Sequence, residues 1–145
     1  MVSSESRESL ADMPTLQAAL AEVFAPWVRE LDLQLLGAHA GEVRLRMPVT
    51  PRHVHAGGVL CGQSMMAACD TAMVLAVMTR LGSFKPMTTV QLQTSFMRPV
   101  PRDSASVTLS ARVLRMGRSL VFGEIQVLTE SGDLAAQATT TYALL

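Results

Sequence analysis

The stretch from His55 to Gly82 reads HAGGVLCGQSMMAACDTAMVLAVMTRLG. From Ser64 to Met78 almost every residue is apolar or small, and there is no polar stripe, which is typical of a helix that is buried on all sides. Gly82 follows the last apolar turn, where a glycine commonly ends a helix. The sequence therefore predicts a long buried helix that ends at Gly82.

One carboxylate, that of Asp70, lies in the middle of this helix. It is the only Asp or Glu between Glu42 and Asp103, although seven Lys and Arg residues fall in the same interval. Burying an unpaired charge is costly, so such an acid needs a partner or a function. Asp70 is therefore the first candidate for a catalytic residue, and the alternative is a structural carboxylate bonded to a nearby backbone group or to Thr71.

The composition favours one domain that also forms subunit interfaces. A length of 145 residues suits a single core, and we expect one domain over residues 1–145. The chain is 49% hydrophobic and only 17% charged, compared with about 25% charged residues in an average protein. The formal net charge is +0, which gives no electrostatic reason to expect a nucleic-acid partner.

The cysteines and the N-terminus favour a cytoplasmic protein. Cys61 and Cys69 are separated by about 12 Å of helical rise, which is too far for a disulfide. The N-terminus lacks the apolar segment of a signal peptide. The apolar run at 59–79 has the length of a membrane span, but Gln63, Asp70 and the glycine-rich entry favour a buried helix and no membrane partner.

The rest of the chain shows one helical pattern and then strand patterns. Residues 1–12 are polar and are expected to be disordered, and apolar residues at helical spacing predict an amphipathic helix over 14–31. Alternation of apolar and polar residues predicts six strands, over 33–39, 42–47, 89–97, 104–116, 120–128 and 134–144. This order predicts an α+β fold in which a curved antiparallel sheet of five or six strands wraps the central helix.

Three motifs surround the central helix. HAGGVLCGQ at 55–63 is followed by DTA at 70–72, a strand ends in Arg-Pro at 98–99, and a Gly-Arg-Ser turn lies at 117–119. Together they resemble the hotdog-fold acyl-CoA thioesterases, and specifically the PaaI-like branch related to phenylacetic acid degradation, in which Asn-x-x-Gly-x-x-His-Gly-Gly commonly precedes the Asp. The resemblance covers about residues 30–145 and implies the hotdog fold.

Three positions depart from the family pattern. His55 stands where Asn or Gln is usual, Cys61 replaces the motif His, and Gln63 replaces the second Gly, whereas Gly62 and Asp70 are retained. The departures leave open a non-catalytic protein that binds an acyl-CoA or a small aromatic molecule. A hotdog enoyl-CoA hydratase or dehydratase is a third alternative, which the Cys in place of the motif His disfavours.

The resemblance implies a role for each motif residue. The Gly62 amide polarises the thioester carbonyl, and Asp70 acts as base or nucleophile, with the two groups supplied by different subunits of a homodimer. His55 orients water or the acyl group, and Thr89 or Thr88 binds water beside Asp70. The residues expected to contact the substrate are Cys61, Gln63, Met66, Arg98, Gly117, Arg118 and Ser119.

The expected partner is an acyl-CoA with an aromatic or medium-chain acyl group. No metal-ligand spacing is diagnostic, and the chain has no P-loop or dinucleotide glycine motif. We therefore predict no metal and no cofactor other than the coenzyme A of the substrate. The expected assembly is a homodimer, with a homotetramer, as a dimer of dimers, as the alternative.

Overall fold

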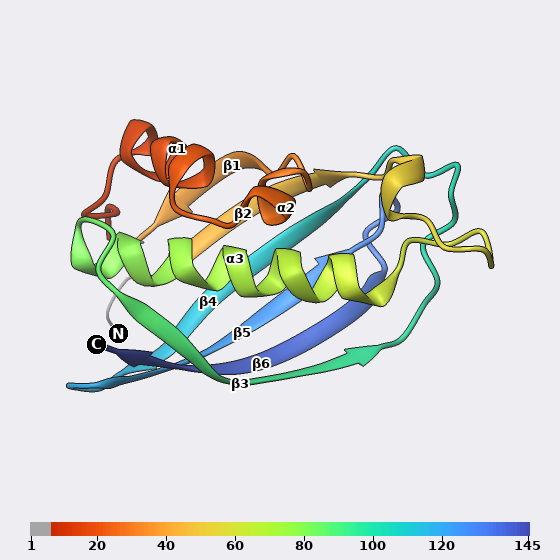
Figure 1. Ribbon diagram of the computed structural model, residues 1–145. Coiled ribbons are helices and arrows are strands. Elements are labelled where there is room, and N and C mark those ends of the chain that lie inside the picture. The colour runs from red at the N-terminus through yellow and green to blue at the C-terminus, as the bar shows by residue number, and fades with distance from the viewer. Residues whose placement is uncertain (1–6) are drawn as a thin grey trace.

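The computed structural model describes residues 7–145, which form two short helices, one long helix and six strands (Figure 1). The N-terminal part contains α1 (Met13–Glu22), α2 (Pro26–Arg29), β1 (Gln34–His39), β2 (Glu42–Pro48) and the 3-10 turn η1 (Pro51–His53). The long helix α3 (Gly62–Leu81) follows. The remaining elements are β3 (Met87–Phe96), β4 (Ser106–Met116), β5 (Leu120–Leu128) and β6 (Leu134–Leu144).

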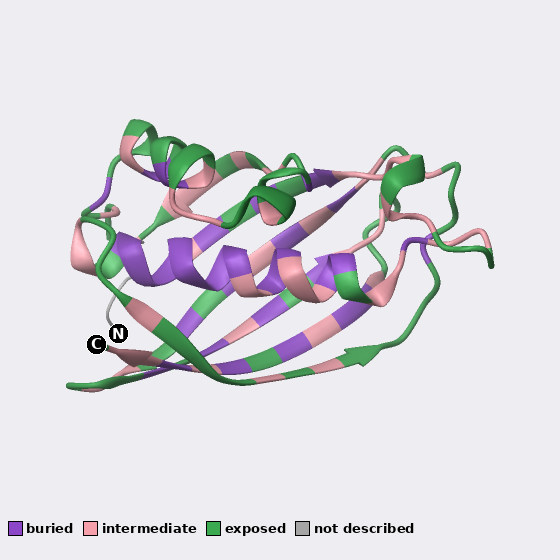
Figure 2. Cartoon of the chain, in the orientation of Figure 1, coloured by how far each residue is buried: buried purple, intermediate pink, exposed green. Residues whose placement is uncertain are grey.

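The six strands form one antiparallel sheet in the order β1-β2-β4-β5-β6-β3. The sheet curves around α3, which contacts every strand (Figure 1). Figure 2 shows that buried residues run along most of α3 and along the inner face of the sheet. This arrangement is the hotdog fold, and it confirms the predicted long helix wrapped by a curved antiparallel sheet.

The helix α3 is apolar all round because the sheet and the N-terminal helices enclose it. Thirteen of its 20 residues are buried, and Gly82 ends it with a left-handed φ of 90°. Within residues 7–145, α3 is also the one helix that is long and apolar enough to cross a membrane. However, 72% of that apolar window is buried inside the protein, so packing in the core accounts for its composition.

The N-terminal segment differs from the prediction in two respects. The helix expected over 14–31 is two helices, because Pro26 has no N–H to continue the ladder and its ring clashes with the preceding turn. Residues 7–12, expected to be disordered, run along the surface of the fold: the Leu10 N–H donates to Thr79 O at 2.8 Å, and Ala11 is the one buried side chain among them, at 1% exposed. The rest of that expectation, for residues 1–6, lies outside the described residues.

The strand β3 lies beside β6 and not beside β4, the strand that follows it in the sequence. Pro99 and Pro101 lie three and five residues after the end of β3, where they cannot extend the ladder, and the chain then crosses to the middle of the sheet. As a result β3 is an edge strand. Within the described residues, its outer side has no neighbouring strand.

Candidate functional site

The carboxylate of Asp70 lies on the side of α3 that faces β3 and β6. Thr89 on β3 donates from Oγ1 to Asp70 Oδ1 at 2.8 Å. The hydroxyl of Tyr142 on β6 donates to the same carboxylate oxygen and lies 2.8 Å from the Asp70 main-chain O. Asp70 is therefore half-buried and held by two hydroxyl groups, rather than enclosed by apolar side chains alone.

A β-bulge places Thr89 at this point of the sheet. Thr89 and Tyr142 are direct partners in the β3–β6 register, which shifts between Thr89 and Gln91. The Thr140 hydroxyl donates to the Gln91 main-chain O at 2.8 Å and secures the strand just beyond the bulge. Bulges commonly re-aim a side chain beside an active site, and this one sets Thr89 against the carboxylate.

Two titratable groups beside Asp70 are held neutral. Burial raises the pKa of the Cys69 thiol to about 12, and the adjacent Asp70 carboxylate adds to the increase. Burial also raises the pKa of the Tyr142 phenol, again with a contribution from Asp70. Near neutral pH the phenol therefore keeps its proton and can donate to the carboxylate.

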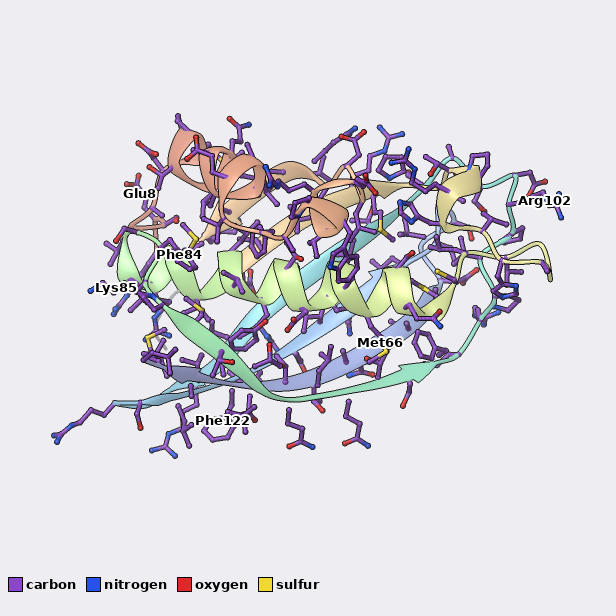
Figure 3. The ribbon with its side chains drawn as sticks, in the orientation of Figure 1. Glu8, Met66, Phe84, Lys85, Arg102 and Phe122 are labelled. Carbon is purple, nitrogen blue, oxygen red and sulfur yellow. The ribbon has the colours of Figure 1, made fainter. Side chains whose placement is uncertain are left out.

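A cavity of about 350 Å³ opens beside Asp70. Asp70, Thr89 and Tyr142 form one wall, and Asp70 is the only charged side chain among the described residues that line the cavity. An apolar pocket with a few convergent polar groups is the usual form of a small-molecule site. Three aromatic residues also line this cavity: Phe24 and Trp27 from the N-terminal segment, and Phe84 from the loop after α3, which is labelled in Figure 3.

Gly62 is the first residue of α3. It lies in a separate hollow of about 330 Å³, which Phe96 and Arg98 also line. The N–H groups of a first helical turn have no partner inside the helix, and the positive end of the helix dipole lies there. Met65 N–H is the first to bond back, to Cys61 O. A Cβ on Gly62 would lie 3.1 Å from Cζ of Phe96, so a larger residue there requires the Phe96 ring to move slightly.

Asp70 and Gly62 do not meet within one chain. Eight residues of helix separate them by about 12 Å of rise, and they line different hollows. One chain alone therefore does not bring its carboxylate and its helix N-terminus to the same carbonyl group.

His55 is exposed on the loop before α3, away from the Asp70 cavity of the same chain. Its Nδ1 accepts from the Gly57 N–H at 2.8 Å, and it lines a surface hollow with Arg102, which Figure 3 shows at the loop end of the molecule. Within residues 7–145, no three His, Cys, Asp or Glu side chains are placed to hold a metal ion.

The predicted substrate contacts near Gly62 lie together. Cys61 is the N-cap of α3 with Sγ 3.0 Å from Ser64 Oγ, and Gln63 is exposed. Met66 is half-buried between α3 and β3 (Figure 3).

The turn Gly117–Ser119 lies at the opposite end of the sheet. The Ser119 main-chain O accepts from the Leu144 N–H at 2.8 Å, and Leu144 pairs with Met87 at the start of β3. Within one chain, the structure therefore does not bring Arg118 to the Gly62 hollow.

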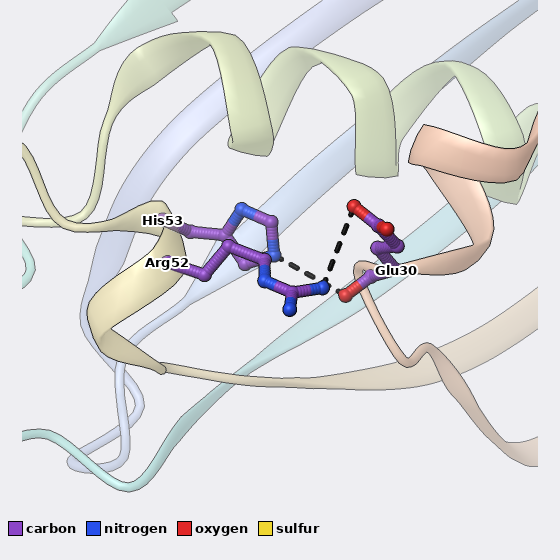
Figure 4. Close-up of polar contacts among 3 residues, drawn as sticks. All are labelled: Glu30, Arg52 and His53. Carbon is purple, nitrogen blue, oxygen red and sulfur yellow. Dashed lines mark hydrogen bonds and ion pairs between the residues drawn. The ribbon is translucent and has the colours of Figure 1, made fainter.

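A polar cluster joins the end of α2 to η1. Arg52 Nη1 lies 3.4 Å from Glu30 Oε2, and His53 Nε2 lies 3.2 Å from the Glu30 main-chain O (Figure 4). Exposed ion pairs contribute little stability. The contacts show that the segment after Trp27 lies beside the loop that leads to α3.

Sequence reasoning missed Tyr142 and the aromatic residues of the cavity. Tyr142 is the only tyrosine of the chain and occupies an inward position of an alternating strand. A buried phenol usually needs a hydrogen-bond partner, and this was the available signal. Phe24 and Trp27 gave no such signal, because a continuous helical pattern counts them as ordinary core residues.

Known proteins resemble this chain over most of its length. A model of the Thioesterase superfamily matches residues 57–136. "Putative esterase TV1331" of Thermoplasma volcanium is 30% identical over 104 residues, which are 72% of this chain and 76% of the relative. The solved structure of zebra fish thioesterase superfamily member 2 is 25% identical, with a TM-score of 0.79 over 91% of this chain and 94% of that chain.

The fold is also that of the E. coli PaaI protein from the phenylacetic acid degradation operon. The TM-score is 0.80 over 91% of each chain, at 15% sequence identity. The family match covers more than half of the chain and includes both Gly62 and Asp70. The chain therefore belongs to the thioesterase superfamily, the hotdog-fold hydrolases of thioester bonds.

Proposed function

We propose that this protein hydrolyses acyl-CoA thioesters with an aromatic or medium-chain acyl group, as a member of the PaaI-like branch. The observation that carries the proposal is the Asp70 carboxylate, which two hydroxyl donors hold at the wall of a cavity that is otherwise uncharged and mostly apolar. The aromatic residues that line this cavity suit an aryl or alkyl group, because contact there removes apolar surface from water.

Asp70 carries the chemistry in this proposal. Thr89 and Tyr142 both donate to Oδ1, which leaves Oδ2 for the reaction. As a base, Oδ2 takes a proton from water while the water oxygen attacks the carbonyl carbon, the C–S bond breaks, and the sulfur receives the proton. As a nucleophile, Oδ2 attacks that carbon itself, coenzyme A leaves, and water cleaves the resulting anhydride. Either route yields a carboxylic acid and free coenzyme A.

The oxyanion donor in this proposal is the Gly62 N–H of a second subunit. Along the edge strand β3, Thr89 contacts Asp70 and Phe96 contacts Gly62. Antiparallel pairing of two β3 strands about a point midway between Thr89 and Phe96 sets Thr89 of one chain opposite Phe96 of the other. Asp70 then lies beside Gly62 of the partner subunit, in a homodimer with two shared sites. A tetramer would contain two such dimers.

The same pairing suits the predicted coenzyme A contacts. It turns the Gly62 end of one subunit toward the end of the other at which the Gly117–Ser119 turn lies. Arg98 from one subunit and Arg118 from the other are then available to the phosphates of coenzyme A, which arginine binds well. Neither His55 nor Cys61 needs to act as a nucleophile.

The test is an acyl-CoA panel assayed by release of free thiol. We expect wild type to turn over aromatic or medium-chain members, and Asp70→Asn to lower kcat by at least about a hundredfold, the usual worth of a positioned acid–base group. Asp103→Asn, the same change at an exposed position, is the matched control. An Asp70→Asn variant as active as wild type would refute the role of Asp70.

A second candidate function is non-catalytic binding of an acyl-CoA or small aromatic molecule, which the departures at Cys61 and Gln63 favour. A thermal shift with phenylacetyl-CoA, in the absence of thiol release from the whole panel, would support it. The hydratase alternative requires a histidine beside the carboxylate, and the position of the motif His is Cys61 in this chain.

A further inference from the structure

A second cavity, of about 500 Å³, adjoins the cavity at Asp70. It lies beneath α1, against the start of β1, and its lining is mixed: Leu20 and Leu35 are apolar, whereas Arg29 and Asp32 are charged. Phe24, Val28 and Thr71 line both cavities. These three residues form the partition between the two spaces.

The partition is built from opposite sides. Thr71 belongs to α3, is 3% exposed, and donates its hydroxyl to the Ala67 main-chain O at 2.8 Å. Val28 belongs to α2, the one-turn helix that lies over α3 in Figure 1. Phe24 belongs to the link between α1 and α2, which Pro26 keeps out of the helix. Phe24 has the largest side chain of the three.

We infer that Phe24 sets the maximum length of the acyl group. With Phe24 in place, an acyl chain that starts at Asp70 ends at the partition, and truncation of Phe24 joins the two cavities into one passage beneath α2. The additional methylene groups would then contact the leucines of the second cavity, on the part of its lining away from the charged Arg29 and Asp32. The inference rests on the proposed function, since its ligand is the acyl chain of the same substrate.

This determinant lies in a part of the chain outside the family match. Phe24 precedes residues 57–136, which contain both Asp70 and Gly62. The chemistry and the length limit therefore come from different segments, so a change at Phe24 alters the choice of substrate without removing Asp70, Thr89 or Tyr142.

The experiment compares kcat/KM for hexanoyl-CoA and tetradecanoyl-CoA in wild type, Phe24→Ala and Phe122→Ala. We expect Phe24→Ala to raise the tetradecanoyl-to-hexanoyl ratio at least about tenfold, because even one methylene in a pocket changes kcat/KM by that order. Phe122→Ala is the matched control, since Phe122 is 38% exposed and points away from α3 (Figure 3). It should leave the ratio unchanged.

A refilling variant separates an opened passage from a loosened fold. Ala21 lines the second cavity and not the first. Adding Ala21→Trp to Phe24→Ala should return the ratio toward the wild-type value, with the melting temperature of each variant recorded. A ratio that stays high after refilling, or one that Phe24→Ala never raised, overturns the inference.

A binding measurement tests the inference about Phe24 independently of whether the protein hydrolyses acyl-CoA. If no variant hydrolyses any acyl-CoA, the proposed function fails, and titration calorimetry with tetradecanoyl-CoA in an Asp70→Asn background decides the inference. In that background, the protein with Phe24→Ala should bind tetradecanoyl-CoA at least about tenfold more tightly than the protein that keeps Phe24. Equal affinity, or no binding by either protein, contradicts it.

Discussion

At the scale of single residues, Asp70 owes its orientation to two strands that pair with each other. A carboxylate that rotates freely is rarely in the orientation that reacts. Positioned donors on one of its oxygens orient it before substrate binds, so the reaction does not have to supply the entropy of that alignment. Thr89 and Tyr142 both address Oδ1, and the raised pKa of the phenol keeps its donor proton in place. Tyr142 is a positioning residue in this reading.

Replacing Tyr142 with Phe tests that role. We expect kcat to fall about tenfold with little change in KM, because the hydroxyl orients the reacting carboxylate. Loss of a hydrogen bond to a charged group should also lower the free energy of unfolding by roughly 1.5–3 kcal/mol. Thr139→Val, which removes an exposed hydroxyl from the same strand, is the control for steady-state kinetics and urea denaturation. An unchanged kcat in Tyr142→Phe would contradict the assignment.

The raised pKa of Cys69 predicts a pH dependence of stability. The thiol titrates at 9.0 in its ordinary state and at about 12 in the folded protein, so above pH 9 the unfolded chain loses the proton first. The contribution of Cys69 to the free energy of unfolding is therefore fully present below pH 9 and is lost as the pH rises toward 12. Its contribution to the slope is at most about 1.4 kcal/mol per pH unit.

Cys69→Ala removes this contribution. Denaturation from neutral to alkaline pH should show a shallower loss of stability in Cys69→Ala than in wild type. At neutral pH the variant has a lower free energy of unfolding than wild type, because the substitution leaves a small cavity in the core. Parallel curves for the two proteins would show that Cys69 does not titrate as proposed.

At the scale of elements, the sequence predicted each strand whose residues alternate between core and solvent. On β2, Val43, Leu45 and Met47 alternate with charged residues, and they are 1%, 0% and 0% exposed. The same pattern does not say which strand lies beside which. The position of β3 next to β6 could therefore not be predicted from alternation, because alternation is a local property and pairing across the sheet is not.

The candidate site also contains residues that the sequence pattern pointed to and residues that it did not. Asp70 could be named as a candidate because one acid in a long apolar run has few structural explanations, and Thr89 was named as the residue that binds water beside it. The aromatic residues of the cavity were not predicted, since apolar spacing continued through Pro26 and concealed the break that turns Phe24 and Trp27 toward the cavity. The catalytic roles of His55 and Gly62 stay predictions.

Gly82 allows a prediction about the end of α3. Its φ of 90° is strained for any residue with a Cβ, so Gly82→Ala should lower the free energy of unfolding by about 1 kcal/mol. Gly37→Ala is the matched control, because no atom lies within 4 Å of its added Cβ and its φ is not left-handed. Urea denaturation of the two variants measures the difference. Equal stability of both would contradict the prediction.

At the scale of the whole molecule, the sheet ends in an edge that lacks the usual protection. Edge strands commonly carry charges or prolines that prevent pairing with another chain. β3 contains neither over Met87–Phe96, and its residues Val90 and Phe96 are 60% and 48% exposed. This edge agrees with the low charge content of the chain and supports the proposed β3–β3 dimer.

Mixing two inactive variants tests the shared site. Asp70→Asn removes the carboxylate, and Gly62→Pro removes the amide donor at the first helical position, where proline is tolerated. Unfolded and refolded together in equal amounts, they should recover about one quarter of wild-type activity, because half of the random dimers hold one intact site of two. Gly62→Ala, which keeps the N–H, controls for the contact with Phe96. A mixture as inactive as its components would exclude the shared site.

The position of Trp27 has a practical consequence. It is the only tryptophan of the chain, it is 61% exposed, and it lines the cavity beside Asp70. Indole emission shifts to shorter wavelength when water around the ring is replaced by apolar groups. The protein thus contains an intrinsic optical reporter at its own entrance, and occupancy can be followed by stopped-flow spectroscopy without any added dye.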